Sequence, residues 1–148
     1  MKIDYRDTSN YLNNKNNFMN EKMSSETNAI NCFEIPATDI SRAKKFYESI
    51  FEIKMEETEM TGMKYAMFPF DPMKAKVAGG LAQSPMHVPG ATGSIIYLNA
   101  NPDLQNVLDR IEKASGKITM PKTAIGQNGF MAFFTDTEGN TMGLHSNN

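Results

Sequence analysis

Apolar and polar residues follow the same order twice along the chain after residue 28. In the first copy, alternating apolar and polar positions predict a strand at 29–36, and an apolar stripe at helical spacing predicts a helix at 41–51. Three strand-like runs follow, at 53–59, 64–70 and 77–83. The second copy repeats this order, at 93–100, 101–116, 117–125, 130–135 and 141–145. A linker with two prolines, residues 84–92, lies between the copies. We therefore expect two tandem βαβββ modules and an α+β fold.

Local signals place the ends of these elements. Thr38, Asp39 and Ser41 offer side-chain caps for the first helix. Asn101 is predicted to cap the second helix with Pro102 at its first position, and Gly116 to end it. Gly126–Gly129 predicts a tight turn between two strands, and Pro121 interrupts the strand before that turn.

Residues 1–28 differ from the rest, because asparagines crowd there without an apolar period. Such a segment buries too little surface to offset its ordering entropy, so a solvated tail is one interpretation. A second is that the natural start is Met19 or Met23. A third is an arm that packs on a partner subunit through its apolar residues, Tyr5, Tyr11, Leu12 and Phe18. We predict this extension at 1–28 and a single domain at 29–148, with modules at about 29–84 and 93–146.

Charge and composition narrow the function classes. A net charge of −2 gives no general field that attracts nucleic acid, and no apolar run is long enough to span a bilayer. The first residues lack the apolar centre of a secretory signal, and a single cysteine excludes an internal disulfide. We therefore expect a cytoplasmic protein. The 12 methionines suit either irregular core packing or an adaptable binding surface.

Two motifs carry a family resemblance. The first is the strand 32–36 followed by Asp39-Ile40-Ser41-Arg42-Ala43 and Phe46-Tyr47. The second is the turn Asp136-Thr137-Glu138-Gly139-Asn140, in which Thr137 replaces a usual proline. Together they resemble the vicinal oxygen chelate superfamily, which includes glyoxalases, bleomycin resistance proteins and dioxygenases. The resemblance covers about residues 29–146.

This resemblance implies two sheets curled into a half-barrel around a cleft, with helices on the convex face. Strand alternation would then direct Phe33, Ile35, Met142 and Leu144 toward the helices. The opposite positions would line the cleft: Cys32, Glu34, Gly80, Ser94, Gly143 and His145.

The resemblance also implies where metal ligands would stand. In metal-dependent relatives four strand positions supply His, Gln or Glu, and here they fall on Cys32, near Gly80, on Ser94 and on Gly143. Glycine has no side-chain donor, serine is a poor ligand, and one thiolate does not make a site. We therefore predict no cofactor and no metal at these positions. A substitute divalent metal site from Cys32, Glu34 and His145 is the alternative.

Glu34 is the candidate catalytic residue. A carboxylate in an apolar cleft would have a raised pKa and could act as a general base. A salt bridge or a water-filled cleft mouth is the competing interpretation. We expect His87, in the linker, to be solvated rather than catalytic.

Three functions remain open from the sequence. The first is a protein that binds a small organic molecule without metal, as in the bleomycin resistance branch. The second is a lyase or isomerase of the glyoxalase type that uses Glu34 or an atypical metal. The third is an interaction domain with a filled cleft. The resemblance also implies a homodimer, and no nucleic acid or membrane partner is expected.

Overall fold

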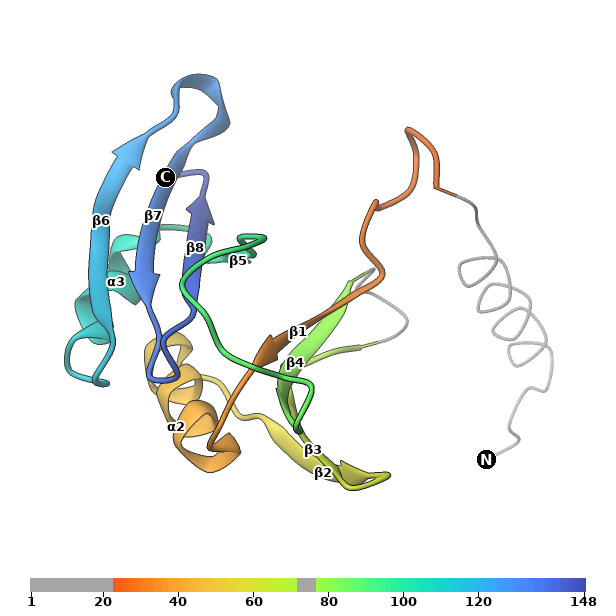
Figure 1. Ribbon diagram of the computed structural model, residues 1–148. Helices are drawn as coiled ribbons and strands as arrows, with labels where there is room; N and C mark the ends of the chain where they lie inside the picture. The colour runs from red at the N-terminus through yellow and green to blue at the C-terminus, as the bar shows by residue number, and fades with distance from the viewer. Residues whose placement is uncertain (1–22, 72–76) are drawn as a thin grey trace, which may run out of the picture. The chain divides into compact units, whose positions relative to one another are not determined.

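A computed structural model describes residues 23–71 and 77–148. The first module contains five elements (Figure 1): β1 (Cys32–Pro36), α2 (Ile40–Phe51), β2 (Glu56–Met60), β3 (Met63–Met67) and β4 (Ala78–Gln83). The second module repeats this order: β5 (Tyr97–Asn99), α3 (Gln105–Ile111), β6 (Lys117–Ala124), β7 (Phe130–Thr135) and β8 (Thr141–Ser146). A short 3₁₀ helix, η1 (Gly126–Asn128), lies between β6 and β7. The predicted α+β class with two βαβββ modules is confirmed.

Each module has its own four-stranded sheet. The order is β1-β4-β3-β2 in sheet 1 and β5-β8-β7-β6 in sheet 2. In sheet 2, β5 runs parallel to β8, and the remaining neighbours are antiparallel. Within the described residues both sheets are open, with β2 and β6 as edge strands. Pro121 lies in β6, where an edge strand tolerates a missing N–H, and the register with β7 shifts on either side of Met120.

The chain divides into two compact units. Among the described residues, one unit combines 23–33 with 70–71 and 77–78, and the other combines Glu34–Pro69 with Gly79–Asn148. In the first unit, Ala78 N–H donates to the Asn31 carbonyl. The second unit holds both helices and all of sheet 2. The predicted residues of the N-terminal arm fall outside the described part of the chain, and the division at residue 28 stays a prediction.

The second unit is built on aromatic packing around α2. This helix buries one stripe: Ile40, Ala43, Phe46, Tyr47 and Ile50. The Phe46 ring lies 5.9 Å from that of Phe134 on β7, and the Tyr47 ring lies 5.6 Å from Phe68, centroid to centroid. Asp39 begins the helix as predicted, because its side chain accepts the Arg42 N–H. Packing of this stripe fixes the helix-facing side of the strands.

Several predicted boundaries were wrong, among them the end of the second helix, which lies at Ile111 rather than next to Gly116. The second helix begins at Gln105 rather than Asn101, because Asp103 accepts the Gln105 N–H and Ser146 Oγ accepts the Leu104 N–H. The strand predicted at 93–100 is only Tyr97–Asn99. Directly before β5, the Gly143 N–H still donates to the Ile96 carbonyl. Further back, the Thr141 hydroxyl donates to the Ala91 carbonyl, and the Gly90 N–H donates to Asn140 Oδ1.

No helix in the described residues is long and apolar enough to cross a membrane. The cytoplasmic location stays a prediction.

Candidate functional site

The first and last strands of each module pair in the same register in both sheets. Ala37 N–H donates to the Ala82 carbonyl in sheet 1, and Ala100 N–H donates to the His145 carbonyl in sheet 2. Counting back along these strands relates the candidate positions of one module to those of the other. Four pairs are equivalent: Cys32 and Ile95, Glu34 and Tyr97, Gly80 and Gly143, and Ala82 and His145.

The side of sheet 2 opposite its buried core carries aromatic and sulfur-containing side chains. Tyr97 on β5 is paired with Gly143 on β8, and Gly143 with Phe133 on β7. Phe134, Met142 and Leu144 are buried against the helices. Because successive side chains of a strand point to opposite faces, Phe133 and Gly143 lie on the face turned away from the helices. We call this surface the open face of sheet 2 and define it by Tyr97, Met131, Phe133, Gly143 and His145.

Tyr97 dominates this face, with 47% of its surface exposed. Its ring centroid lies 5.7 Å from that of Phe133, at an interplanar angle of 53°. A Cβ placed on Gly143 would lie 2.6 Å from Tyr97 Cδ1. The absent side chain of Gly143 therefore makes the space in which the tyrosine ring lies against the sheet.

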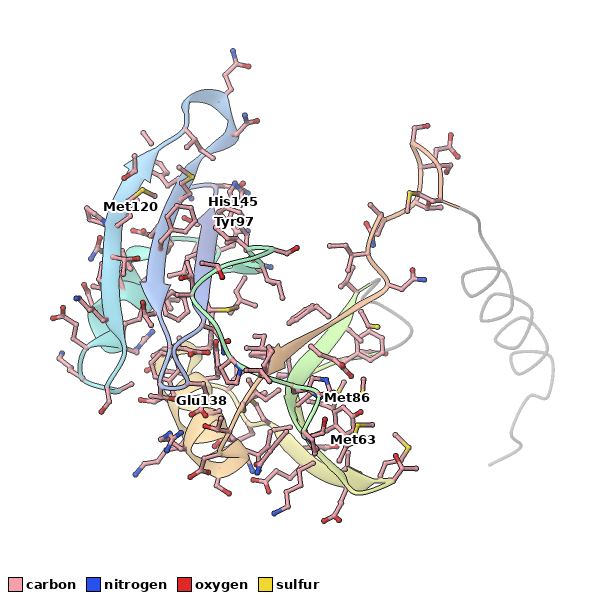
Figure 2. All side chains as sticks on the ribbon, viewed as in Figure 1. Met63, Met86, Tyr97, Met120, Glu138 and His145 are labelled. Carbon is pink, nitrogen blue, oxygen red and sulfur yellow. The ribbon has the colours of Figure 1, made fainter. Side chains whose placement is uncertain are left out.

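His145 lies on the same side of β8, two residues beyond Gly143 (Figure 2). Its Nε2 is 2.7 Å from the Asn128 carbonyl oxygen, which only accepts, so Nε2 carries the proton. In the neutral ring Nδ1 is then the acceptor. The loop after β6 thus fixes the tautomer of a histidine on the open face.

Two of the positions at which the resemblance predicts metal ligands, Gly80 and Gly143, have little room for a larger side chain. A Cβ on Gly80 would lie 2.5 Å from the Ala66 carbonyl oxygen, and Gly143 is covered by Tyr97. Neither glycine could become a glutamate without moving its neighbours. The described residues contain no group of three or more His, Cys, Asp or Glu arranged to hold a metal ion. The residues present therefore do not fit the superfamily's usual metal.

Cys32 and Ser94 are both exposed, and Ser94 precedes β5 rather than lying in it. By the shared register, Ile95 rather than its neighbour Ser94 is the equivalent of Cys32. Cys32 belongs to the first compact unit and His145 to the second. Their place in one cleft, and the alternative metal set with Glu34, remain predictions.

Glu34 is held by a residue that we expected to be solvated. Its Oε2 lies 2.8 Å from His87 Nε2, and His87 Nδ1 lies 2.7 Å from Ser84 Oγ. The His87 side chain is only 15% exposed, whereas that of Glu34 is 49% exposed. The apolar enclosure that our general-base hypothesis requires is therefore incomplete. The only local signal for the hydrogen bonds among Ser84, His87 and Glu34 was the Ser84-to-His87 spacing, which is typical of a turn capped by a hydroxyl.

The two motifs that carry the family resemblance bind each other. Glu138 of the closing motif accepts hydrogen bonds from Arg42 and from the hydroxyl and N–H of Thr38. It also accepts the N–H of Asp39. We call this set the intermodule joint. These residues connect the modules rather than line a binding surface.

Electrostatics strengthen this joint. Burial alone would raise the pKa of Glu138, but hydrogen bonds from Arg42 and Thr38 outweigh it and lower that pKa to about 2. Beside it, the Tyr47 hydroxyl donates to Asp136 Oδ2 at 2.8 Å, and Asn140 donates to the same carboxylate. Burial, and then the Asp136 charge, raise the pKa of Tyr47 well above its usual range. Tyr47 therefore stays a neutral donor in the core.

Comparison with known proteins agrees with this architecture. The model of the glyoxalase/bleomycin resistance protein/dioxygenase superfamily matches residues 29–144. The "Putative glyoxylase CFP32" of Mycobacterium bovis is 29% identical over 116 residues, which cover 77% of this chain and 44% of that protein. The Mycobacterium tuberculosis protein of the same name matches equally. The chain spans less than half the length of these curated relatives.

Solved structures show the same fold. TnmS3, an antibiotic binding protein from Streptomyces sp. CB03234, has a TM-score of 0.60 at 20% identity, covering 83% of this chain and 98% of its own. A glyoxalase I mutant from Zea mays has a TM-score of 0.57 at 18% identity, covering 78% of this chain and 45% of its own. At these identities the likeness concerns the fold alone.

Proposed function

Because the chain belongs to the glyoxalase/bleomycin resistance protein/dioxygenase superfamily, we propose that it binds a small organic molecule with a flat aromatic group, without the superfamily's usual metal. The binding surface is the open face of sheet 2. A ring stacked there would gain about 1 kcal/mol beyond its burial, as aromatic pairs do.

The half-exposed ring of Tyr97 carries this proposal. A large aromatic side chain left exposed beside a second ring, Phe133, marks a surface that gains free energy from a partner. The half-buried side chain of Met131 adds a flexible, polarisable contact on the same face. TnmS3, whose fold is alike, is described as an antibiotic binding protein, and this supports an organic ligand here.

A thermal-shift screen with flat aromatic compounds and with divalent metals tests the proposal. We expect stabilisation by one class of aromatic compound and none by nickel, zinc or manganese alone. Tyr97→Ala should weaken binding about tenfold, the effect of removing a stacked ring. Tyr65→Ala, on sheet 1, is the matched control and should bind as the wild type does. Equal binding by both variants would refute the placement on sheet 2.

The alternative is a lyase or isomerase of the glyoxalase type in which Glu34 removes a proton next to a carbonyl. Its support is the His87 hydrogen bond to Oε2, which leaves Oε1 of Glu34 without a protein partner among the described contacts. The relative named as a glyoxylase also favours it. Turnover of a thiol–aldehyde adduct, with and without added metal, and its loss in Glu34→Gln would support this alternative. Absence of turnover under both conditions would end it.

The proposal includes a homodimer, because the superfamily commonly completes its binding sites between subunits. Light scattering at micromolar concentration should give twice the mass of the 148-residue chain. A monomer at that concentration would remove this part of the proposal and leave the ligand experiment unaffected.

A further inference from the structure

We propose that Ser84 is a nucleophile toward activated esters, with His87 as its general base and Glu34 as the residue that orients His87. This inference concerns the turn after β4 and is separate from the open face of sheet 2. It rests on the order in which three side chains exchange hydrogen bonds. Ser84 Oγ lies 2.7 Å from His87 Nδ1, and His87 Nε2 lies 2.8 Å from Glu34 Oε2, so the three side chains form a continuous chain of hydrogen bonds.

The donor and acceptor of each hydrogen bond are fixed by the carboxylate of Glu34. An ionised glutamate only accepts, so His87 Nε2 donates to Glu34. In the neutral imidazole Nδ1 is then the acceptor, so the Ser84 hydroxyl donates to it. The Met86 N–H donates to Ser84 Oγ at 3.2 Å, which agrees with this direction and restrains the serine rotamer. The serine proton is thus already directed at a base, as a nucleophile requires.

Exposure and backbone geometry also suit this role. The His87 N–H donates to the Ser84 carbonyl, so the turn that carries both residues is closed by its own backbone. His87 is largely shielded from water, while Ser84 is half-buried and Glu34 half-exposed. An ester can therefore reach the serine, and the carboxylate fixes the ring's tautomer as the third member of a catalytic triad does.

The reaction balances without a co-reactant other than water. Ser84 Oγ forms a bond to the acyl carbon as its proton passes to His87 Nδ1. The aryloxide leaves as its bond to the acyl carbon breaks, and it takes the proton from His87. Water then attacks the acyl carbon as one of its protons passes to His87 Nδ1. The bond between the acyl carbon and Ser84 Oγ breaks as Oγ takes this proton back from His87, which releases the acid and restores the serine hydroxyl and the neutral imidazole.

para-Nitrophenyl acetate is the probe. We expect release of nitrophenol and, in peptide mass spectra, an acetyl group on Ser84. Ser84→Ala should abolish the acetylation. His87→Gln and Glu34→Gln should slow it at least tenfold, since removing a base or its orienting group costs triads more than this. Ser49→Ala, an exposed serine on α2, should react as the wild type does.

Further measurements keep this result separate from folding and from ligand binding. Imidazole in the buffer should restore part of the rate in His87→Gly, which a merely structural role would not allow. Acetyl groups on lysines alone, or equal Ser84 acetylation in the wild type and His87→Gln, would overturn the inference. Because Ser84→Ala should keep full affinity for the aromatic ligand, the two proposals can fail independently.

Discussion

The two sheets offer different chemistry at equivalent positions. In sheet 1 the register places Glu34 beside Gly80, and Glu34 is tied to His87 of the linker. In sheet 2 the same register places Tyr97 beside Gly143, and Tyr97 stacks on Phe133. At the matched position sheet 1 has a carboxylate bonded to its own linker, and sheet 2 has a half-exposed aromatic ring. A duplicated backbone therefore does not imply a duplicated site, because the side chains at matched positions decide what each sheet can bind.

The largest effect should come from the matched glycines. An alanine Cβ at Gly80 would lie 2.5 Å from the backbone oxygen of Ala66, which cannot swing aside, whereas at Gly143 it would meet the ring of Tyr97, which can. We expect Gly80→Ala to lower the free energy of unfolding by about 3 kcal/mol and Gly143→Ala by about 1 kcal/mol, in urea denaturation. Gly90→Ala has open space and is the control. Equal losses at both glycines would contradict the distinction between the sheets.

The next effect concerns the intermodule joint that holds both modules. Glu138 has a lowered folded-state pKa of about 2 against an ordinary 4.5, so its contribution is complete above about pH 4.5 and is lost as pH falls toward 2. After allowance for the half-exposed Arg42, we expect Glu138→Gln to lose about 2 kcal/mol at neutral pH.

The variant should also lose part of the wild type's dependence on pH between those values, measured by denaturation at each pH. Glu52→Gln removes the exposed partner of Arg110 and should change stability by less than about 0.5 kcal/mol. A Glu138→Gln protein as stable as Glu52→Gln would show that the joint is not needed.

A smaller effect is expected from exchanging the chemistry of the two faces. Tyr97→Glu places on sheet 2 the residue type that sheet 1 has at the equivalent position. Because the aromatic platform is removed, affinity for the flat ligand should fall at least tenfold in calorimetry, while stability changes by about 1 kcal/mol or less. Glu34→Gln leaves the sheet 2 platform intact and should keep full affinity. Unchanged binding by Tyr97→Glu would assign the ligand to another surface.

The smallest effect should come from releasing the linker. His87→Asn removes the hydrogen bond to the half-exposed carboxylate of Glu34, so the loss of stability should stay below about 1 kcal/mol. Amide exchange should nonetheless quicken at Met86 and His87, whose N–H groups bond to Ser84. Exchange rates equal to those of the wild type would mean that the turn does not need its histidine.

Particular residues show how much of the fold could be predicted from the sequence. The apolar periods predicted both modules, Asp39 was correctly identified as a helix cap, and Gly126–Gly129 as the turn before β7. These features depend on neighbours a few residues apart, which a pattern records. The second helix was placed too early because Leu104 is bonded by Ser146, 42 residues away, which no local pattern contains.

The candidate site was less predictable. Alternation correctly directed Ile35, Met142 and Leu144 into the core. It did not reveal that Glu34 meets His87, 53 residues away, or that Tyr97 lies over Gly143. The interpretation of Glu138 and Arg42 also changed, from family signatures to a bonded pair 96 residues apart.

By itself the sequence determined the repeated order of elements and the core-facing positions, since these follow from local periodicity and residue type. Only the tertiary structure decided which exposed side chains meet. Hydrogen bonds and ring contacts form across long chain separations, and their geometry depends on strand register and on space left by glycines such as Gly143.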